Sequence, residues 1–131
     1  MAKAVHMMIR VLEEERSVKF YQSTFGFQVS HRLAFDDFTL VYMRAPEAPF
    51  EIELTINLGR KDPYEHGSAY GHVAFVVDDL NAEHRRFVDG GLQPNPIKEF
   101  KRGDELLARF FFVTDPDGYR IEVLQRHGHY Q

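Results

Sequence analysis

Two histidines and two glutamates occupy matching positions in the two halves of this sequence. His6 and His72 each lie in or beside a short apolar segment typical of a β-strand, and Glu53 and Glu122 lie in later segments of the same kind. The His-to-Glu distance along the chain is similar in both halves. Because the chain has no cysteine, metal ligands must come from histidine, glutamate or aspartate. The pattern therefore predicts a duplicated, pseudo-symmetric metal site.

Strand alternation puts these residues on polar faces. Side chains two positions apart share a face of a strand, so His6 lies beside Arg10 and Glu53 beside Asn57. The intervening residues are apolar and suit packing against a helix. A single histidine or glutamate on a strand is more often an ordinary side chain than a ligand. Four at equivalent places of two repeats indicate a site, and a curled sheet would make its surface concave.

Two units of the same element order must position these residues. A strand at residues 5–11 precedes a helix that starts after Leu12 and ends at Gly26. A strand at 71–77 precedes a helix that starts at Asp78-Asp79 and ends at Gly90. Acidic residues at the helix starts and glycines at their ends favour both helices. Strand-like segments follow each helix: 27–33, 38–43 and 50–57 in the first half, and 106–113 and 119–125 in the second.

The second unit is interrupted where the strand after its helix is expected. Pro94, Pro96 and the charged segment 98–105 stand there, so this strand is the least supported element. Asp115-Pro116-Asp117-Gly118 predicts a tight turn between the last two strands, because proline presets the turn and glycine accepts positive φ.

These elements predict an α+β fold of two tandem βαβββ modules that form curled mixed sheets. The modules span about residues 4–58 and 71–126, with a linker at about 59–70, and together make a single domain over residues 1–131.

Composition excludes several classes of protein. The chain has 131 residues, 44% of them hydrophobic, which is enough for a packed core. The net charge is −4 and the basic residues are scattered, which argues against nucleic acid as a partner. No apolar run approaches the length of a membrane span, and the N-terminus has no apolar signal region. We therefore expect a soluble, cytoplasmic protein with neither a membrane nor a nucleic acid as partner.

Three motifs carry a resemblance to a known family. They are Glu53-Leu54-Thr55-x-Asn57, Ala69-Tyr70-Gly71-His72 and Asp115-Pro116-Asp117-Gly118-Tyr119-x-Ile121-Glu122. With them the chain resembles glyoxalase I (lactoylglutathione lyase) of the vicinal oxygen chelate superfamily, over about residues 5–125. The third motif on its own would indicate only the superfamily.

The resemblance implies a ligand set and an assembly. The family is a homodimer whose two sites use strands from both chains, with waters completing an octahedral metal site. Arg10 and Asn57 match the residues that contact the glutamyl end of glutathione, and a guanidinium suits a carboxylate. Four residues match the metal ligands: His6, Glu53, His72 and Glu122. Nickel is favoured because the chain lacks the insert of longer, zinc-preferring members, and cobalt or zinc also fits.

The reaction implied is the isomerisation of the methylglyoxal–glutathione hemithioacetal to S-lactoylglutathione by proton transfer through an enediolate. The metal supplies Lewis acidity. Glu122 is expected to be the base, and Glu53 a ligand that can also act as a base. The charged segment that begins at Lys98 departs from the family. Lys98 or Lys101 could bind the glycyl carboxylate of the thiol, and the identities of the thiol and the aldehyde stay open.

Two alternatives remain on sequence grounds. One is another metal-dependent enzyme of the superfamily, such as a dioxygenase, a thiol transferase or an epimerase. Typical dioxygenases and transferases use two histidines and one glutamate, so Glu53 as a fourth ligand argues against them. The other is a non-catalytic small-molecule binding protein of the same fold, which has no need of all four ligands.

Overall fold

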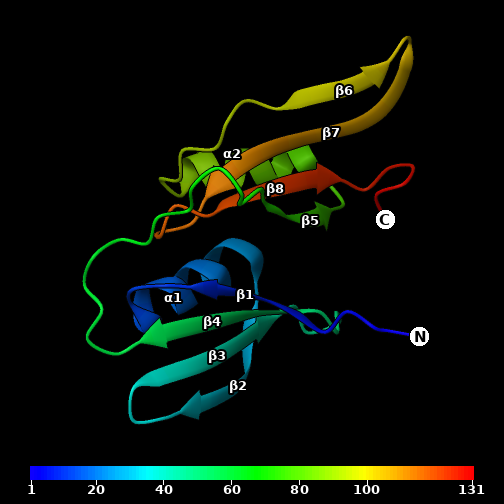
Figure 1. Cartoon of the computed structure of the whole chain (residues 1–131). Helices are drawn as coiled ribbons and strands as arrows, with labels where there is room; N and C mark the ends of the chain where they lie inside the picture. The colour runs from blue at the N-terminus through cyan, green and yellow to red at the C-terminus, as the bar shows by residue number, and fades with distance from the viewer. The chain divides into compact units, whose positions relative to one another are not determined.

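The computed structural model describes residues 1–131 and divides into two compact units, Met1–Glu65 and His66–Gln131. Each unit has one strand, one helix and three further strands (Figure 1). The first contains β1 (His6–Arg10), α1 (Glu14–Phe25), β2 (Gln28–Ala34), β3 (Phe38–Arg44) and β4 (Glu51–Asn57). The second contains β5 (Val73–Val77), α2 (Leu80–Asp89), β6 (Lys98–Arg102), β7 (Glu105–Thr114) and β8 (Arg120–Gln125).

Both units form a four-stranded mixed sheet of the same topology. The strand order is β1-β4-β3-β2 in the first and β5-β8-β7-β6 in the second. In each sheet the first strand pairs parallel with the last, and the other pairs are antiparallel. The expected α+β fold of two βαβββ modules is confirmed. That the two modules make one domain stays a prediction. No helix of the structure is long and apolar enough to span a membrane.

The helix of each unit covers one face of its own sheet. In the first unit Ile52, Leu54 and Ile56 of β4 are buried, together with Phe20 and Tyr21 of α1. Burial of one such side chain stabilises the fold by about 2 kcal/mol. The apolar residues predicted to face the helix therefore do so, and the residues between them are left on the opposite face.

The second unit repeats this packing. Phe87 of α2 meets Phe111 of β7 edge to face, with ring centroids 5.5 Å apart. Ile121 and Val123 of β8 are buried in the same core. The side chain of Asp79 caps α2 by accepting a hydrogen bond from the amide of Ala82 at 3.0 Å, as the sequence predicts.

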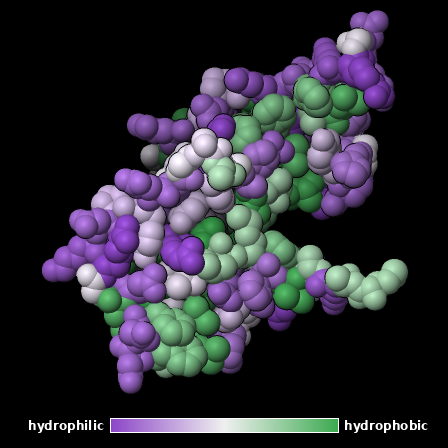
Figure 2. Space-filling model, viewed as in Figure 1, coloured by the Kyte–Doolittle hydropathy of each residue, from purple (hydrophilic) through white to green (hydrophobic).

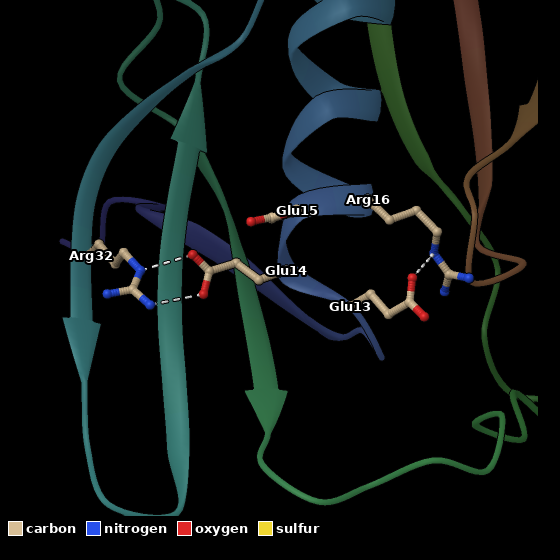
Figure 3. Close-up of a pocket in the computed structure, with 5 residues that line it drawn as sticks. All are labelled: Glu13, Glu14, Glu15, Arg16 and Arg32. Carbon is tan, nitrogen blue, oxygen red and sulfur yellow. Dashed lines mark hydrogen bonds and ion pairs between the residues drawn. The ribbon is translucent and has the colours of Figure 1, made fainter.

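An ion pair fixes the start of α1 against β2. Figure 3 shows the carboxylate of Glu14 facing the guanidinium of Arg32. Nε and Nη2 of Arg32 donate to the two oxygens of Glu14 at 2.8 and 2.9 Å. This hydrogen bonding, with the charge of Arg32, lowers the pKa of Glu14 against the smaller opposing effect of burial. At the other end of the helix Gly26 adopts φ 69°, a left-handed conformation that suits glycine.

The charged segment of the second half forms a strand rather than interrupting one. β6 lies at the edge of its sheet with all five side chains exposed, and it pairs with β7. Charged side chains suit such an edge because they discourage pairing with another chain. Gly103, at φ 61°, turns the chain between β6 and β7. The tip of this hairpin is hydrophilic (purple, upper right in Figure 2).

The turn before β8 has the predicted form. Oδ1 of Asp115 accepts hydrogen bonds from the amides of Asp117 and Tyr119, both at 2.9 Å. Gly118 takes φ 91°. The turn thereby fixes the start of the strand that carries Glu122.

Candidate metal centre

The first unit brings His6 and Glu53 together. His6 begins β1, and Glu53 lies in the middle of the neighbouring parallel strand β4, opposite Met8. Both side chains lie on the face of the sheet opposite to the buried residues of β4. Nε2 of His6 is 3.3 Å from Oε2 of Glu53. The imidazole is 38% exposed and the carboxylate 12%, so the pair is accessible from solvent.

The second unit brings His72 and Glu122 together in the same way. His72 directly precedes β5, and Glu122 on the parallel strand β8 lies opposite Ala74. In both units the glutamate pairs with the residue two positions after the histidine. Nε2 of His72 is 3.4 Å from Oε2 of Glu122. The similar distances along the sequence therefore correspond to identical register in the two sheets.

Each pair fits two neighbouring ligands of a divalent metal. With metal–ligand bonds of about 2.1 Å, adjacent ligand atoms lie about 3.0 to 3.4 Å apart in octahedral or tetrahedral geometry. The separations of 3.3 and 3.4 Å agree with this. The structure gathers no group of three or more histidine, cysteine or acidic side chains that could hold a metal. Each unit thus brings together two of the candidate ligands, and the four-residue site stays a prediction.

An aromatic side chain lies beside each pair. The sequence did not single out either residue, because each is identified by its register rather than by its type. Tyr42 of β3 pairs with Glu53, and its ring meets His6 edge to face at 5.7 Å and 74°. Phe112 of β7 pairs with Glu122, and its ring meets His72 edge to face at 5.2 Å and 79°. The internal repeat therefore extends to the aromatic neighbours of the pairs.

The two aromatic residues differ by one hydroxyl. The Tyr42 hydroxyl belongs to the direct strand neighbour of Glu53. Hydrogen bonding with Glu53, followed by burial and by the negative charges of Glu53 and Glu51, raises the pKa of Tyr42 to about 12. Phe112 has no hydroxyl. The guanidinium of Arg120 lies over its ring, 4.0 Å from the ring centre. A phenol thus lies beside one carboxylate and a phenyl ring beside the other.

Two of the predicted substrate contacts lie beyond the first pair. Arg10 and Asn57 come four residues after His6 and Glu53, at the carboxyl ends of the parallel strands β1 and β4. Arg10 is exposed. Asn57 is partly buried and donates from Nδ2 to the hydroxyl of Tyr64 at 3.1 Å. Arg10 lies on the same strand face as His6, and Asn57 lies on the same face as Glu53. A guanidinium and an amide therefore lie on the face that carries the pair.

The third predicted contact, Lys98, belongs to the second unit. It is exposed at the start of β6, where it pairs in register with Phe110 of β7. Its role in binding stays a prediction.

A cluster of rings holds the segment that leads to His72. The imidazole of His66 stacks on Tyr119 with centroids 4.1 Å apart, and Tyr70 meets both rings edge to face. Burial, and then the negative charge of Asp115, raises the pKa of Tyr70. Nε2 of His66 and the hydroxyl of Tyr70 are buried without a hydrogen-bond partner. The cluster ties the approach to β5 to the residue just before β8.

Known proteins resemble the chain over both units. A family model described as the Glyoxalase/Bleomycin resistance protein/Dioxygenase superfamily matches residues 3–123. The lactoylglutathione lyase of Haemophilus influenzae is 39% identical over 126 residues, which cover 92% of this chain and 90% of that protein. The lactoylglutathione lyase of Neisseria meningitidis serogroup A is 35% identical over 129 residues, 95% and 91% of the two chains. The solved structure of the trypanothione-dependent glyoxalase I of Leishmania major matches with a TM-score of 0.76 and 33% identity, over 95% of this chain and 87% of that one.

Proposed function

This chain belongs to the Glyoxalase/Bleomycin resistance protein/Dioxygenase superfamily, and we propose that it is a metal-dependent lactoylglutathione lyase. Its substrate is the hemithioacetal of methylglyoxal and glutathione, and its product is S-lactoylglutathione. The observation that carries the proposal is the repeated His–Glu pair, with separations of 3.3 and 3.4 Å that suit neighbouring metal ligands. Relatives named lactoylglutathione lyase, 39% and 35% identical over nearly the whole chain, support the reaction.

The complete ligand set combines both pairs. His6 and Glu53 of one chain join His72 and Glu122 of a second chain, so that a homodimer has two sites. The presence of only two ligands in each unit supports this assembly. Glyoxalase I enzymes are metal-dependent in general. For this chain nickel is favoured, and cobalt or zinc also suits a set of two imidazoles and two carboxylates.

The residues of the chain have separate tasks in the reaction. Glu122 takes the proton from C1 of the hemithioacetal. The electron pair of that C–H bond forms a double bond to C2, and the π pair of the C2 carbonyl moves onto its oxygen to give the enediolate. Glu122 then returns the proton to C2, while the hydroxyl proton on the C1 oxygen passes to the C2 oxygen and leaves a thioester. When bound, the metal would supply Lewis acidity at the two vicinal oxygens. Base catalysis of this kind contributes about 10²–10⁴-fold to the rate.

Binding of the thiol falls to charged and polar groups away from the reacting carbons. Arg10 and Asn57 hold the glutamyl end, and Lys98 binds the glycyl carboxylate. A guanidinium is suited to a carboxylate because it donates two parallel hydrogen bonds. The cytoplasmic location expected from the sequence stays a prediction.

A thioester assay on the purified protein tests this function. The protein is stripped of metal with a chelator, and nickel, cobalt or zinc is then added singly before S-lactoylglutathione formation is measured. We expect turnover that disappears on chelation and returns with metal. A folded protein that shows no turnover with any of the three metals contradicts the proposal, and retained binding of a small molecule in that case favours the non-catalytic alternative.

The same assay addresses the thiol. Hemithioacetals of glutathione and of trypanothione are compared, because the Leishmania major relative is trypanothione-dependent. We expect a higher kcat/KM with glutathione. A preference for trypanothione contradicts the thiol assignment and leaves the lyase reaction intact.

A further inference from the structure

The side chain of Asn57 is held by a residue that the proposed reaction does not use. Asn57 ends β4, where it pairs in register with Phe38 of β3. Its Nδ2 donates a hydrogen bond to the hydroxyl of Tyr64 at 3.1 Å, and both side chains are partly buried. The strand therefore fixes the backbone of Asn57, and the phenol restrains the torsions of its side chain.

Tyr64 is in turn held by Arg60. The guanidinium of Arg60 lies over the Tyr64 ring, 4.3 Å from the ring centre. Nε of Arg60 donates to the carbonyl oxygen of Asp62 at 2.8 Å, and Nη2 donates to that of Pro63 at 3.2 Å. These two bonds keep the cation over the ring, where the negative face of the π system attracts it. The phenol is thus presented to the amide by a braced side chain.

The turn that leads from β4 into this segment is fixed as well. The backbone amide of Arg60 donates to the carbonyl oxygen of Asn57 at 3.2 Å. Residues 57–64 therefore form one local structure that begins at Asn57 and returns to it through Tyr64. All of it lies in the first unit, which also contains Arg10.

The restrained amide keeps hydrogen-bonding capacity for a ligand. Oδ1 of Asn57 and the second hydrogen on Nδ2 are left without a partner in the protein. One is an acceptor and the other a donor, so together they suit a group that carries both an ammonium and a carboxylate. The glutamyl end of glutathione is such a group, and Arg10 on the neighbouring parallel strand adds a cation for its carboxylate.

We propose that Tyr64 is a positioning residue that holds the Asn57 amide in the orientation that binds the glutamyl end of the thiol. The inference rests on the proposed function, in which Asn57 contacts that end, and it adds the residue that orients Asn57. An amide that is already restrained loses less conformational entropy on binding, so more of its interaction stabilises the complex. Because the glutamyl end does not react, the effect falls on binding and not on the chemical step.

Removal of one hydroxyl tests the inference. Tyr64→Phe keeps the ring beneath Arg60 and removes only the atom that accepts from Asn57. We expect the dissociation constant of S-methylglutathione, measured by calorimetry, and the KM of the glutathione hemithioacetal each to rise by about 3–10-fold, with kcat unchanged. Tyr130→Phe removes a phenol from the other unit and is the matched control, with the values of the wild type.

A double-mutant cycle separates positioning from a general effect on the fold. Asn57→Ala removes the amide that Tyr64 holds. If Tyr64 acts through this amide, Tyr64→Phe has no further effect on the dissociation constant of S-methylglutathione in the Asn57→Ala background. An equal effect of Tyr64→Phe with and without Asn57 overturns the inference.

The remaining outcomes separate this inference from the proposed function. Calorimetry with S-methylglutathione needs no turnover, so an inactive protein that binds it more weakly after Tyr64→Phe, and only when Asn57 is present, contradicts the lyase reaction and supports the positioning role. A folded Tyr64→Phe variant with wild-type dissociation constant and KM overturns the inference, as does one in which only kcat falls. A wild-type protein that neither binds S-methylglutathione nor acts on the glutathione hemithioacetal overturns both proposals.

Discussion

Glu53 and Glu122 occupy equivalent positions in the two repeats, but their neighbouring side chains differ. Both pair in register with an aromatic residue and both approach a histidine within 3.4 Å. Glu53 has the phenol of Tyr42 beside it, and Glu122 has the ring of Phe112. In the proposed reaction, Glu53 serves as a metal ligand and Glu122 as the base that carries the proton between two carbons.

Glu122→Gln removes the proposed base and keeps the shape of the side chain. We expect kcat to fall by about 10²–10⁴-fold, because an amide cannot take up the proton. The melting temperature should change little, since this side chain is not part of the apolar core. Steady-state kinetics and metal analysis on the same preparation make the measurement. Full turnover together with full metal content would show that another group is the base.

The candidate ligands could be predicted from residue type and alternation, and their aromatic neighbours could not. A histidine and a glutamate are recognisable in the sequence because both types bind metals. Tyr42 and Phe112 are identified only by the register of β3 on β4 and of β7 on β8, which one-dimensional patterns do not fix. The pKa of Tyr42, raised to about 12, likewise follows from a contact between strands.

At the scale of elements, the helix starts and turns follow local chemistry, and β6 does not. Asp79 and Asp115 act as cap and turn residues within four positions along the chain. β6 consists mainly of charged residues and exists because β7 offers it an edge to pair with. The sequence pattern could not locate this strand, because the strand depends on pairing with β7 and not on a local pattern of apolar residues.

The contact between α1 and β2 predicts a dependence of stability on pH. The Arg32 hydrogen bonds lower the pKa of Glu14 below its ordinary value of 4.5. A carboxyl whose pKa is lower in the folded state stabilises the protein above that ordinary value, and the effect is lost as the pH falls through the lowered pKa. We expect the wild type to melt slightly above Glu14→Gln at pH 7, and the difference to vanish in acid.

Thermal melts of both proteins from pH 7 to pH 3 measure this difference. Added salt should reduce it at pH 7, because the pair is largely exposed. A gap in melting temperature that widens on acidification contradicts the assignment.

The ring cluster before β5 predicts a stabilising substitution. Nε2 of His66 is buried without a partner, while the ring itself stacks on Tyr119. His66→Phe keeps the stack and removes the unpaired atom, so we expect the free energy of unfolding to rise by about 1 kcal/mol. His84→Phe is the matched control. Nε2 of His84 lies 2.9 Å from the carbonyl oxygen of Asn95, so its loss should destabilise the protein. Urea denaturation of the two variants compares them, and a less stable His66→Phe refutes the account of this cluster.

At the scale of the whole molecule, duplication gives two units that each contain half of the candidate ligand set. Each has its own sheet, its own helix and its own core. Neither gathers the three or more ligands that a catalytic metal usually has. The repeat could be predicted from the order of elements along the chain. The arrangement of the halves in an assembly could not, because it depends on surfaces rather than on strand patterns.

Mixed dimers test directly whether the two half-sites of different chains combine into one lyase site. Glu53→Ala and Glu122→Ala chains with different tags are co-expressed, and dimers that contain one of each are purified by both tags. Each variant alone should be inactive. In the mixed dimer, one of the two sites regains His6 and Glu53 from one chain and His72 and Glu122 from the other. We predict about half of the wild-type turnover per dimer. Mixed dimers that are folded, supplied with metal and as inactive as their parents would contradict the account.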